Sequence, residues 1–524
     1  MLLIVPFLLG LTSALAFAPV GWWPLMPLAF AGLAELIARA PTMKRALLIG
    51  WLFGIGQFAL GLNWIATAFT FQAAMPAWLG WIAVVLLSLY LAVYPMLATG
   101  LAWRFGRNSR LALVLALAGG WALTEWLRAT MFTGFAWNPV GVIWVDTFVR
   151  AAAGWVGTYG LSLLTVVAGG GLWWFAYGLH REIVRKPMTW RRGGVILLLF
   201  VAPELILIAI SPFLFDNPDR QPASGTSVRI VQPNIGQEDK WRAGFAEEAA
   251  RRLAGLSAGG GAEPRLLLWP EAAVTRPLED SRAGEFRAFA QYEQTRAAAL
   301  LRGGDLLLTG GISLDSKDGA SVSSATNSVF VIDQLGRIRA RYDKAHLVPY
   351  GEYLPMRPLL SAIGLSRLAP GNIDFNAGPG ARTLALPGFG KVGLQICYEI
   401  IFSGQVVDRA NRPDFLFNPS NDAWFGAWGP PQHLAQARLR AAEEGLPVVR
   451  STPTGISALI DARGTLVEAL PWRTAGVIDG RLPPARSGLT LFARLGNLLP
   501  LALGFSLLIW AVVLDARRRY RHII

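Results

Sequence analysis

The amino-acid sequence predicts a multi-domain protein with an all-α transmembrane bundle of eight helices and one α/β domain. Three observations lead to this prediction. The chain is unusually apolar, with 53% hydrophobic residues and a mean hydropathy of +0.41. Its 21 tryptophans are typical of a protein whose indole rings lie at the lipid headgroups. Between residues 227 and 482 the apolar runs give way to alternating short strands and amphipathic helices, which indicates an α/β domain.

Composition also argues against several kinds of site and partner. The single cysteine, Cys397, excludes an internal disulfide framework, and 4 histidines without an HExxH pair argue against a metal centre. The net charge of +14 could indicate a nucleic-acid partner, but the basic residues stand in short blocks beside apolar runs, which favours membrane topology. We therefore expect a membrane as partner, and no nucleic acid, metal or cofactor.

Eight apolar runs are expected to cross the membrane, and those between residues 46 and 210 each have close to the ~20 residues needed for about 30 Å of hydrocarbon. They are residues 2–18, 25–37, 46–69, 78–103, 111–127, 155–179, 194–210 and 491–514. The first run has two interpretations. Ala14-Leu15-Ala16 resembles a signal-peptide cleavage site, but no positive charge precedes the run, which favours a retained helix.

The distribution of positive charge predicts the orientation. With a cytoplasmic N-terminus, the loops after the second, fourth, sixth and eighth runs should be basic. Each of these loops contains several basic residues: Arg39, Lys44 and Arg45; Arg104, Arg107 and Arg110; Arg181, Arg185, Lys186, Arg191 and Arg192; Arg517, Arg518, Arg519 and Arg521. We therefore expect a multi-pass membrane protein whose long polar region faces outward, which in a bacterium is the periplasm. Residues 1–215 would form helices one to seven, 226–483 the outward-facing domain, 490–515 the eighth helix and 516–524 a cytoplasmic basic tail.

Hydrophobic periodicity places the elements of the α/β domain. We expect strands at residues 228–233, 265–269, 305–310, 326–332, 337–342, 391–396, 415–418, 448–452 and 457–460, and helices at 245–256, 286–301 and 432–444. Residues 333–336 read Asp-Gln-Leu-Gly, which predicts a hairpin turn between two of these strands.

Three ionisable residues, Glu271, Lys344 and Cys397, come at or just beyond the ends of expected strands. Singly, each has an ordinary explanation. Cys397 could be a buried structural thiol, Glu271 could cap a helix that begins at Ala272, and Lys344 could be a solvated loop charge. Together they suit acyl transfer, because a thiol of pKa about 8.5 needs a base or a nearby cation to form thiolate. A carboxylate can be that base, and an ammonium can stabilise the tetrahedral oxyanion.

The motifs around these residues resemble the nitrilase (carbon–nitrogen hydrolase) superfamily and its Glu–Lys–Cys triad. They are Leu-Trp-Pro-Glu271, the run from Lys344 to Glu352, and Gln-Ile-Cys397-Tyr398-Glu399. Together with the apolar runs and the segments at 420–426 and 432–434, they resemble the apolipoprotein N-acyltransferase family over nearly the whole chain. The resemblance implies an αββα sandwich carried on eight membrane helices.

The resemblance also implies a ping-pong reaction. The Cys397 thiolate would attack the sn-1 ester of a phospholipid, with phosphatidylethanolamine as the expected donor, and form a thioester acyl-enzyme. The N-terminal amine of a diacylglyceryl-cysteine in an apolipoprotein would then accept the acyl chain. Glu271 would be the general base, and Lys344 with the backbone N–H of Tyr398 would hold the oxyanion.

Further residues have supporting roles by the same resemblance. Glu352 would orient Lys344, while Glu399 and the Tyr398 side chain would support the pocket. Trp241 matches a mobile aromatic residue of the family near the entrance.

The apolar segment 359–365 is open to two interpretations. Leu360 and Ile363 could form part of a lid over the acyl chains, or could simply pack in a core. Both substrates are held in the bilayer by acyl chains, at about 0.8 kcal/mol per buried CH₂, so a site at the membrane avoids most of the cost of extracting them.

Two other functions compete with acyl transfer to a lipoprotein. One is a membrane-tethered, nitrilase-type amidase that uses water as acceptor. The other is a transporter or lipid-binding scaffold with a degenerate catalytic domain. Eight spans exceed what a tether needs, and the intact set of Glu271, Lys344 and Cys397 argues against degeneration.

Overall fold

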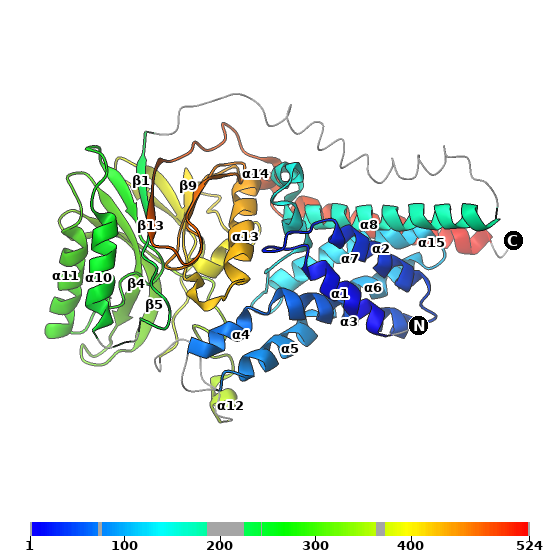
Figure 1. The fold of residues 1–524 in the computed structure, drawn as a ribbon, viewed down its shortest axis with the longest axis horizontal. Helices are drawn as coiled ribbons and strands as arrows, with labels where there is room; N and C mark the ends of the chain where they lie inside the picture. The colour runs from blue at the N-terminus through cyan, green and yellow to red at the C-terminus, as the bar shows by residue number, and fades with distance from the viewer. Residues whose placement is uncertain are drawn as a thin grey trace. The chain divides into compact units, whose positions relative to one another are not determined.

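The computed structural model describes residues 3–71, 76–185, 225–240, 242, 244–362 and 373–521. The chain divides into two compact units, and Figure 1 colours both by residue number. A helical unit contains Met1–Asn63, Trp81–Pro218 and Leu489–Ile524, and an α/β unit contains Trp64–Gly80 and Asp219–Gly488.

The helical unit is built from apolar helices. Every predicted apolar run within the described residues is at least partly helical, while the run at 194–210 lies outside them. The helices are α1 (Ile4–Ala14), α2 (Leu25–Ala38), α3 (Met43–Gly61), α5 (Leu79–Leu91), α6 (Val93–Gly106), α7 (Arg110–Thr130), α8 (Ala153–Arg185), α14 (Leu491–Leu495) and α15 (Leu498–Arg521). The sequence therefore predicted the helical character of this unit correctly.

Four stretches among the described residues are long and apolar enough to cross a membrane: Leu79–Gly106, Arg110–Thr130, Phe148–Gly178 and Leu498–Arg518. A fifth results if α3 and the bent continuation Ile65–Phe71 are counted as one span, with a bend of 50°. Helices α1 and α2 are apolar but shorter. The total of eight spans remains a prediction.

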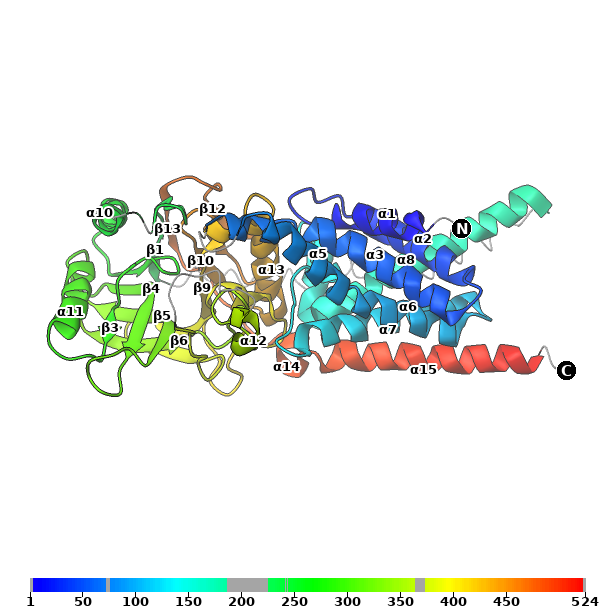
Figure 2. The ribbon, with the colours of Figure 1, turned by 90° about the horizontal axis from the view of Figure 1, so that it is seen from below.

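Glycines set the spacing of helices in this unit. A Cβ atom on Gly10 of α1 would lie 2.0 Å from the carbonyl oxygen of Phe53, and one on Gly56 of α3 would lie 2.2 Å from that of Phe7. Small residues allow helix backbones to pack this closely, which matters in lipid, where no hydrophobic force drives helices together. Helix α15 runs alongside α7 (Figure 2).

The α/β unit contains two mixed sheets. The first has the order β13-β1-β2-β4-β5-β6 with β3 beside β4, and the second has the order β12-β11-β10-β9-β8-β7. The strands are β1 (Ser227–Gln232), β2 (Arg265–Leu268), β3 (Glu279–Asp280), β4 (Leu306–Asp315), β5 (Ser324–Asp333), β6 (Ile338–Asp343), β7 (Thr383–Leu386), β8 (Gly390–Leu394), β9 (Phe415–Pro419), β10 (Val448–Ser451), β11 (Ala458–Ile460), β12 (Leu466–Ala469) and β13 (Gly476–Arg481). In each sheet the central strands are parallel: β1, β2 and β4 in one, β8, β9 and β10 in the other.

Alternation along the strands produces four layers. In β2, Leu266 and Leu268 pack in the core between the sheets together with Val392 and Phe417 of the second sheet. Leu267 points the other way and packs in a second core with Leu253. Helices α10 (Phe245–Ser257) and α11 (Glu285–Ala298) cover the first sheet, and α13 (Gly429–Glu444) covers the second (Figure 1). This is the αββα sandwich that the resemblance implied.

One predicted span is interrupted. The apolar run at 46–69 does not form a single helix, because α3 ends at Gly61 and α4 (Ile65–Ala68) and η1 (Phe69–Phe71) belong to the α/β unit. The ring of Trp64 packs 4.6 Å from that of Phe425, and Phe71 lies 5.9 Å from Trp424, between ring centroids. Aromatic contacts of this kind hold the segment against the domain.

Candidate active site

Glu271 lies in a tight turn just beyond β2. The Gly310 N–H donates to the Pro270 carbonyl at 3.2 Å, so β4 passes directly beside this turn. A Cβ atom on Gly310 would lie 2.6 Å from the Glu271 Cα atom, which only glycine avoids. Ala272 has φ +50°, a left-handed conformation uncommon for residues other than glycine, and no helix begins there. The alternative interpretation of Glu271 as a helix cap is therefore wrong.

Lys344 follows β6 and is almost completely buried, at 1% exposure. Its Nζ atom lies 3.4 Å from Glu271 Oε1 and 2.9 Å from Glu352 Oε1. The Asn327 side chain on β5 donates to the same two oxygens, at 2.8 Å and 2.9 Å. The ammonium and the amide therefore bridge the two carboxylates and fix them in one place.

Cys397 begins the short helix η4 (Cys397–Ile401) immediately after β8. Its φ of +51° is left-handed, and strained conformations of this kind persist where the surroundings hold them, often at functional sites. Asn418 Nδ2 and His433 Nε2 contact the Cys397 carbonyl oxygen at 3.3 Å and 3.0 Å. The backbone N–H of Asn421 donates to the thiol sulfur. The backbone carbonyl and the thiol of Cys397 therefore both have hydrogen-bond partners.

Glu399 connects the Cys397 turn to the Lys344 loop. Its Oε2 accepts the Ile396 N–H at 2.7 Å, and its Oε1 accepts the N–H groups of Ala345 and His346 at 2.7 Å and 3.0 Å. The Tyr342 hydroxyl also donates to it, at 3.0 Å. Burial raises the pKa of Glu399 to about 7, against the lowering effect of these donors.

The charges around the thiol oppose one another. Burial raises the pKa of Cys397 well above its usual value, the Glu271 charge raises it further, and Lys344 lowers it. Burial alone would lower the pKa of Lys344, but Glu271, Glu352 and Cys397 together raise it above its usual value. Lys344 therefore stays charged, and the surroundings of Cys397 favour the protonated thiol.

A second lysine faces the same centre. Lys240 is partly buried and interacts electrostatically with Glu271 and Cys397, and burial lowers its pKa to about 8. With the amide of Asn421 turned so that its oxygen accepts from Trp424 Nε1 at 3.1 Å, that oxygen also accepts from Lys240 Nζ at 3.3 Å. The sequence analysis did not identify Lys240 as a site residue. The one feature of the sequence that could have indicated it is its position next to Trp241.

Behind the nucleophile lies a buried group of charged residues. Asp422 accepts two hydrogen bonds from Arg450 Nη2, at 2.8 Å and 2.7 Å, and its Oδ1 lies 2.9 Å from His433 Nδ1. Although burial raises the pKa of Asp422, the neighbouring Arg450 and His433 lower it below its usual value. Because His433 contacts the Cys397 carbonyl oxygen, this group supports the turn that carries the thiol.

The remaining predicted residues have different outcomes. Tyr398 is buried, with its ring centroid 5.1 Å from that of Phe402. Leu360 lies on α12 (Arg357–Ala362), which has no buried residue, and the adjacent Leu359 is 60% exposed. Within the described part of the segment, Leu359 is exposed and Leu360 is partly buried, so the two interpretations stay open. Trp241 and Ile363 lie outside the described residues.

Two family models match the chain. The apolipoprotein N-acyltransferase N-terminal domain matches residues 9–171, and the carbon–nitrogen hydrolase domain matches residues 227–490. The apolipoprotein N-acyltransferase of Rhodopseudomonas palustris is 35% identical over 98% of this chain and 95% of its own length. That of Bradyrhizobium diazoefficiens is 35% identical over 97% of this chain and 94% of its own length. A nitrilase-superfamily protein from Saccharomyces cerevisiae, known by crystal structure, covers 49% of this chain and 90% of its own, with 18% identity and a TM-score of 0.36.

Proposed function

The chain belongs to the apolipoprotein N-acyltransferase family of the carbon–nitrogen hydrolase superfamily, and we propose that Cys397 carries an acyl chain from a phospholipid to a lipoprotein amine. The donor is the sn-1 chain of a phospholipid, phosphatidylethanolamine foremost. The acceptor is the N-terminal amine of diacylglyceryl-cysteine in an apolipoprotein. The observation that carries this proposal is the buried cluster in which the Lys344 ammonium pairs with Glu271 and interacts electrostatically with Cys397.

In the first half-reaction, Glu271 takes the proton of the Cys397 thiol, and the thiolate attacks the ester carbon. The tetrahedral oxyanion is held by the Lys344 ammonium and the Tyr398 backbone N–H. The C–O bond then breaks, Glu271 returns the proton to the leaving lysophospholipid hydroxyl, and a thioester remains on Cys397.

In the second half-reaction, the acceptor amine attacks the thioester carbon. Glu271 takes a proton from the attacking nitrogen, the C–S bond breaks, and the Cys397 sulfur regains a proton as the amide forms. Glu352 orients Lys344 throughout, because its Oε1 lies 2.9 Å from the ammonium while its Oε2 accepts the Val348 N–H at 2.9 Å.

The proposed location is a bacterial inner membrane, with the catalytic domain on the periplasmic side. The basic loops on the opposite side of the predicted spans support this orientation, because basic loops stay in the cytoplasm. Proteolysis of intact spheroplasts tests the sidedness. Cleavage within the α/β unit is the expected result, and cleavage only after lysis would place the domain in the cytoplasm.

Leu360 and Ile363 are proposed to form part of a lid over the acyl chains, with Trp241 near the entrance. The exposure of Leu359 on α12 supports this role, since an apolar side chain on a solvated helix is available to contact lipid. Replacing Leu360 and Ile363 with serine should slow transfer from long-chain phospholipid more than from a short-chain ester. An equal effect on both donors would contradict the lid.

Mass spectrometry separates this function from its alternatives. The full chain in detergent is incubated with phosphatidylethanolamine and then with a diacylglyceryl-cysteine peptide, and Cys397→Ser is the control. An acyl adduct on Cys397 that the peptide amine removes supports the transferase. Removal by water alone at the same rate would instead identify an amidase-type hydrolase, and no adduct would contradict acyl transfer.

A further inference from the structure

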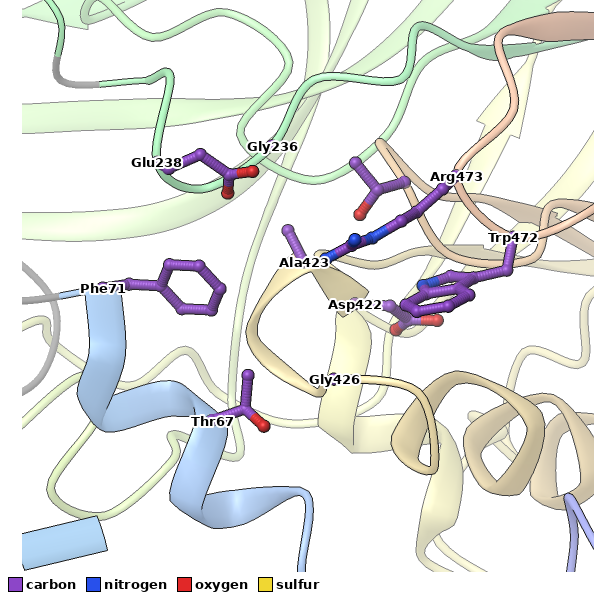
Figure 3. Close-up of a pocket in the computed structure, with 10 residues that line it drawn as sticks. Thr67, Phe71, Gly236, Glu238, Asp422, Ala423, Gly426, Trp472 and Arg473 are labelled. Carbon is purple, nitrogen blue, oxygen red and sulfur yellow. The ribbon is translucent and has the colours of Figure 1, made fainter. Parts of the chain in front are cut away.

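A pocket opens beside the catalytic cluster, on the far side of the turn that follows Asn421. Its lining includes Arg473, Glu238, Asp422 and the α4–η1 residues Thr67 and Phe71 (Figure 3). All of these residues belong to the α/β unit. Since the Asn421 N–H donates to the Cys397 sulfur, the pocket begins within one residue of a group that touches the nucleophile.

Arg473 supplies the positive charge of this pocket. Its side chain extends toward Ala423 in Figure 3, and within the described part of the chain its guanidinium has no ion-pair partner. Its φ is +57°, and its backbone N–H donates to the Thr454 carbonyl at 2.8 Å. A residue other than glycine in this uncommon conformation indicates that the surroundings hold its backbone.

Glu238 supplies a separate negative charge. Its carboxylate folds over Gly236, so that a Cβ atom at that position would lie 2.6 Å from the carboxylate carbon. No ion pair of Glu238 occurs among the residues that the structure describes. The other acidic group of the lining, Asp422, is already neutralised by Arg450. The pocket therefore presents one cation and one anion that have no ion-pair partner among the described residues, and the cation stacks on the Trp472 ring at 4.6 Å from its centroid.

Phe71 and Thr67 form the part of the lining below Glu238 in Figure 3. The Phe71 ring packs against Trp424, and a Cβ atom on Gly426 would lie 2.7 Å from the Thr67 hydroxyl oxygen. Trp472 lies on the Arg473 side of the pocket (Figure 3). A site of separated opposite charges with aromatic walls suits a zwitterion, whose ammonium can also contact an aromatic face.

We propose that this pocket binds the phosphoethanolamine head group of the donor lipid, with the phosphate on Arg473 and the ammonium on Glu238. This proposal rests on the proposed function, since it supplies a head-group subsite for the lipid whose ester Cys397 attacks. The lining residue Asp422 directly follows Asn421, whose N–H donates to the Cys397 sulfur, so the proposed head-group site borders the segment that contacts the thiol.

The kinetic test compares acylation of Cys397 in the full chain by three donors. These are phosphatidylethanolamine, phosphatidylglycerol and an acyl ester without a head group. In Arg473→Gln, we compare the acylation rate with a phospholipid to the rate with the ester that lacks a head group. This ratio should fall about tenfold, because the loss of one charge-assisted contact raises the KM for the phospholipid. For Glu238→Gln, the ratio of phosphatidylethanolamine to phosphatidylglycerol rates should fall by a similar factor. Arg337→Gln, at an exposed arginine of the β5–β6 turn, is the matched control.

A binding test separates this proposal from the transfer reaction itself. Water-soluble glycerophosphoethanolamine is titrated onto the Cys397→Ala variant by ligand-observed NMR, with and without Arg473→Gln. Binding that Arg473→Gln weakens supports the subsite, even if no acyl adduct ever forms. Acyl transfer with unchanged donor ratios in both variants would overturn the subsite and leave the proposed function standing. Arg473→Gln could instead slow only the step in which the acceptor peptide removes the acyl group from Cys397. That result would also overturn the subsite, since the pocket would then bind the acceptor and not the donor lipid.

Discussion

The Glu399 carboxylate accepts the backbone N–H of Ala345 at 2.7 Å and thereby ties the Cys397 turn to the Lys344 loop. Three N–H groups and one hydroxyl from the two segments converge on this single carboxylate. The position of the ammonium relative to the sulfur therefore depends on a residue that need not touch substrate.

Glu399→Gln should lower the single-turnover rate of Cys397 acylation about a hundredfold. The substitution replaces one carboxylate oxygen of Glu399 with an NH₂ group, which faces N–H donors and cannot accept from them. Each buried donor left without an acceptor costs about 1–3 kcal/mol of stability. Tyr342→Phe is the control, because it removes one donor and keeps the carboxylate. A Glu399→Gln rate close to that of the wild type would show that the two segments hold their positions without this link.

Lys240 should give the acylation rate a dependence on pH near its pKa of about 8. The folded protein lowers this pKa, so the ammonium is charged below pH 8 and neutral above it, and only the charged form favours the Cys397 thiolate. Lys240→Gln should reduce the rate about tenfold near pH 7, equivalent to about one pKa unit of the thiol. Lys240→Arg keeps its charge and should lack the decline above pH 8. The same decline in Lys240→Arg would exclude Lys240 as its source.

Asn327→Leu should lower the rate of Cys397 acylation by about 10- to 100-fold. The amide donates to both Glu271 and Glu352, and its loss breaks a buried hydrogen-bond network that holds the two carboxylates. The single-turnover acylation rate is the readout. Thr326→Val, on the same strand, is the control because its hydroxyl bonds Ser328 instead. An Asn327→Leu rate equal to that of the wild type would contradict the bridging role of Asn327.

Asp422→Asn should destabilise the α/β unit by about 3–5 kcal/mol, since it leaves the fully buried Arg450 charge without its carboxylate. Denaturant unfolding in detergent, followed by tryptophan fluorescence, measures the change. Glu263→Gln breaks an exposed ion pair with Arg481 and should cost less than about 1 kcal/mol. Equal effects of the two substitutions would mean that Arg450 finds another partner.

Much of the α/β unit was predictable from sequence because its central strands are short runs rich in Leu, Val and Phe, and β2, β9 and β10 are buried along their whole length. The hairpin of β5 and β6 occurs where the Asp-Gln-Leu-Gly turn predicted it, and Glu271, Lys344 and Cys397 each follow a strand as expected. Glu271 and Lys344 follow β2 and β6 of the first sheet and Cys397 follows β8 of the second, so the site forms where strand ends of the two sheets meet.

The rest depended on contacts that no local pattern records. Asn327 is one polar residue within an apolar strand, and only its hydrogen bonds to two carboxylates distinguish it from its neighbours. The segment 64–71 continues an apolar run, and so predicts a membrane helix, yet Trp64 and Phe71 pack on aromatic residues of the α/β unit. Tertiary packing overrides hydrophobic length in this segment.

The most direct test of the account is a single-turnover time course of intact mass for the wild type and Glu271→Gln with phosphatidylethanolamine. The wild type should gain one acyl group on Cys397. Glu271→Gln should gain it at least about a hundredfold more slowly, because the general base is lost. Acylation of Glu271→Gln at the wild-type rate, or an acyl group on any residue other than Cys397, would contradict it.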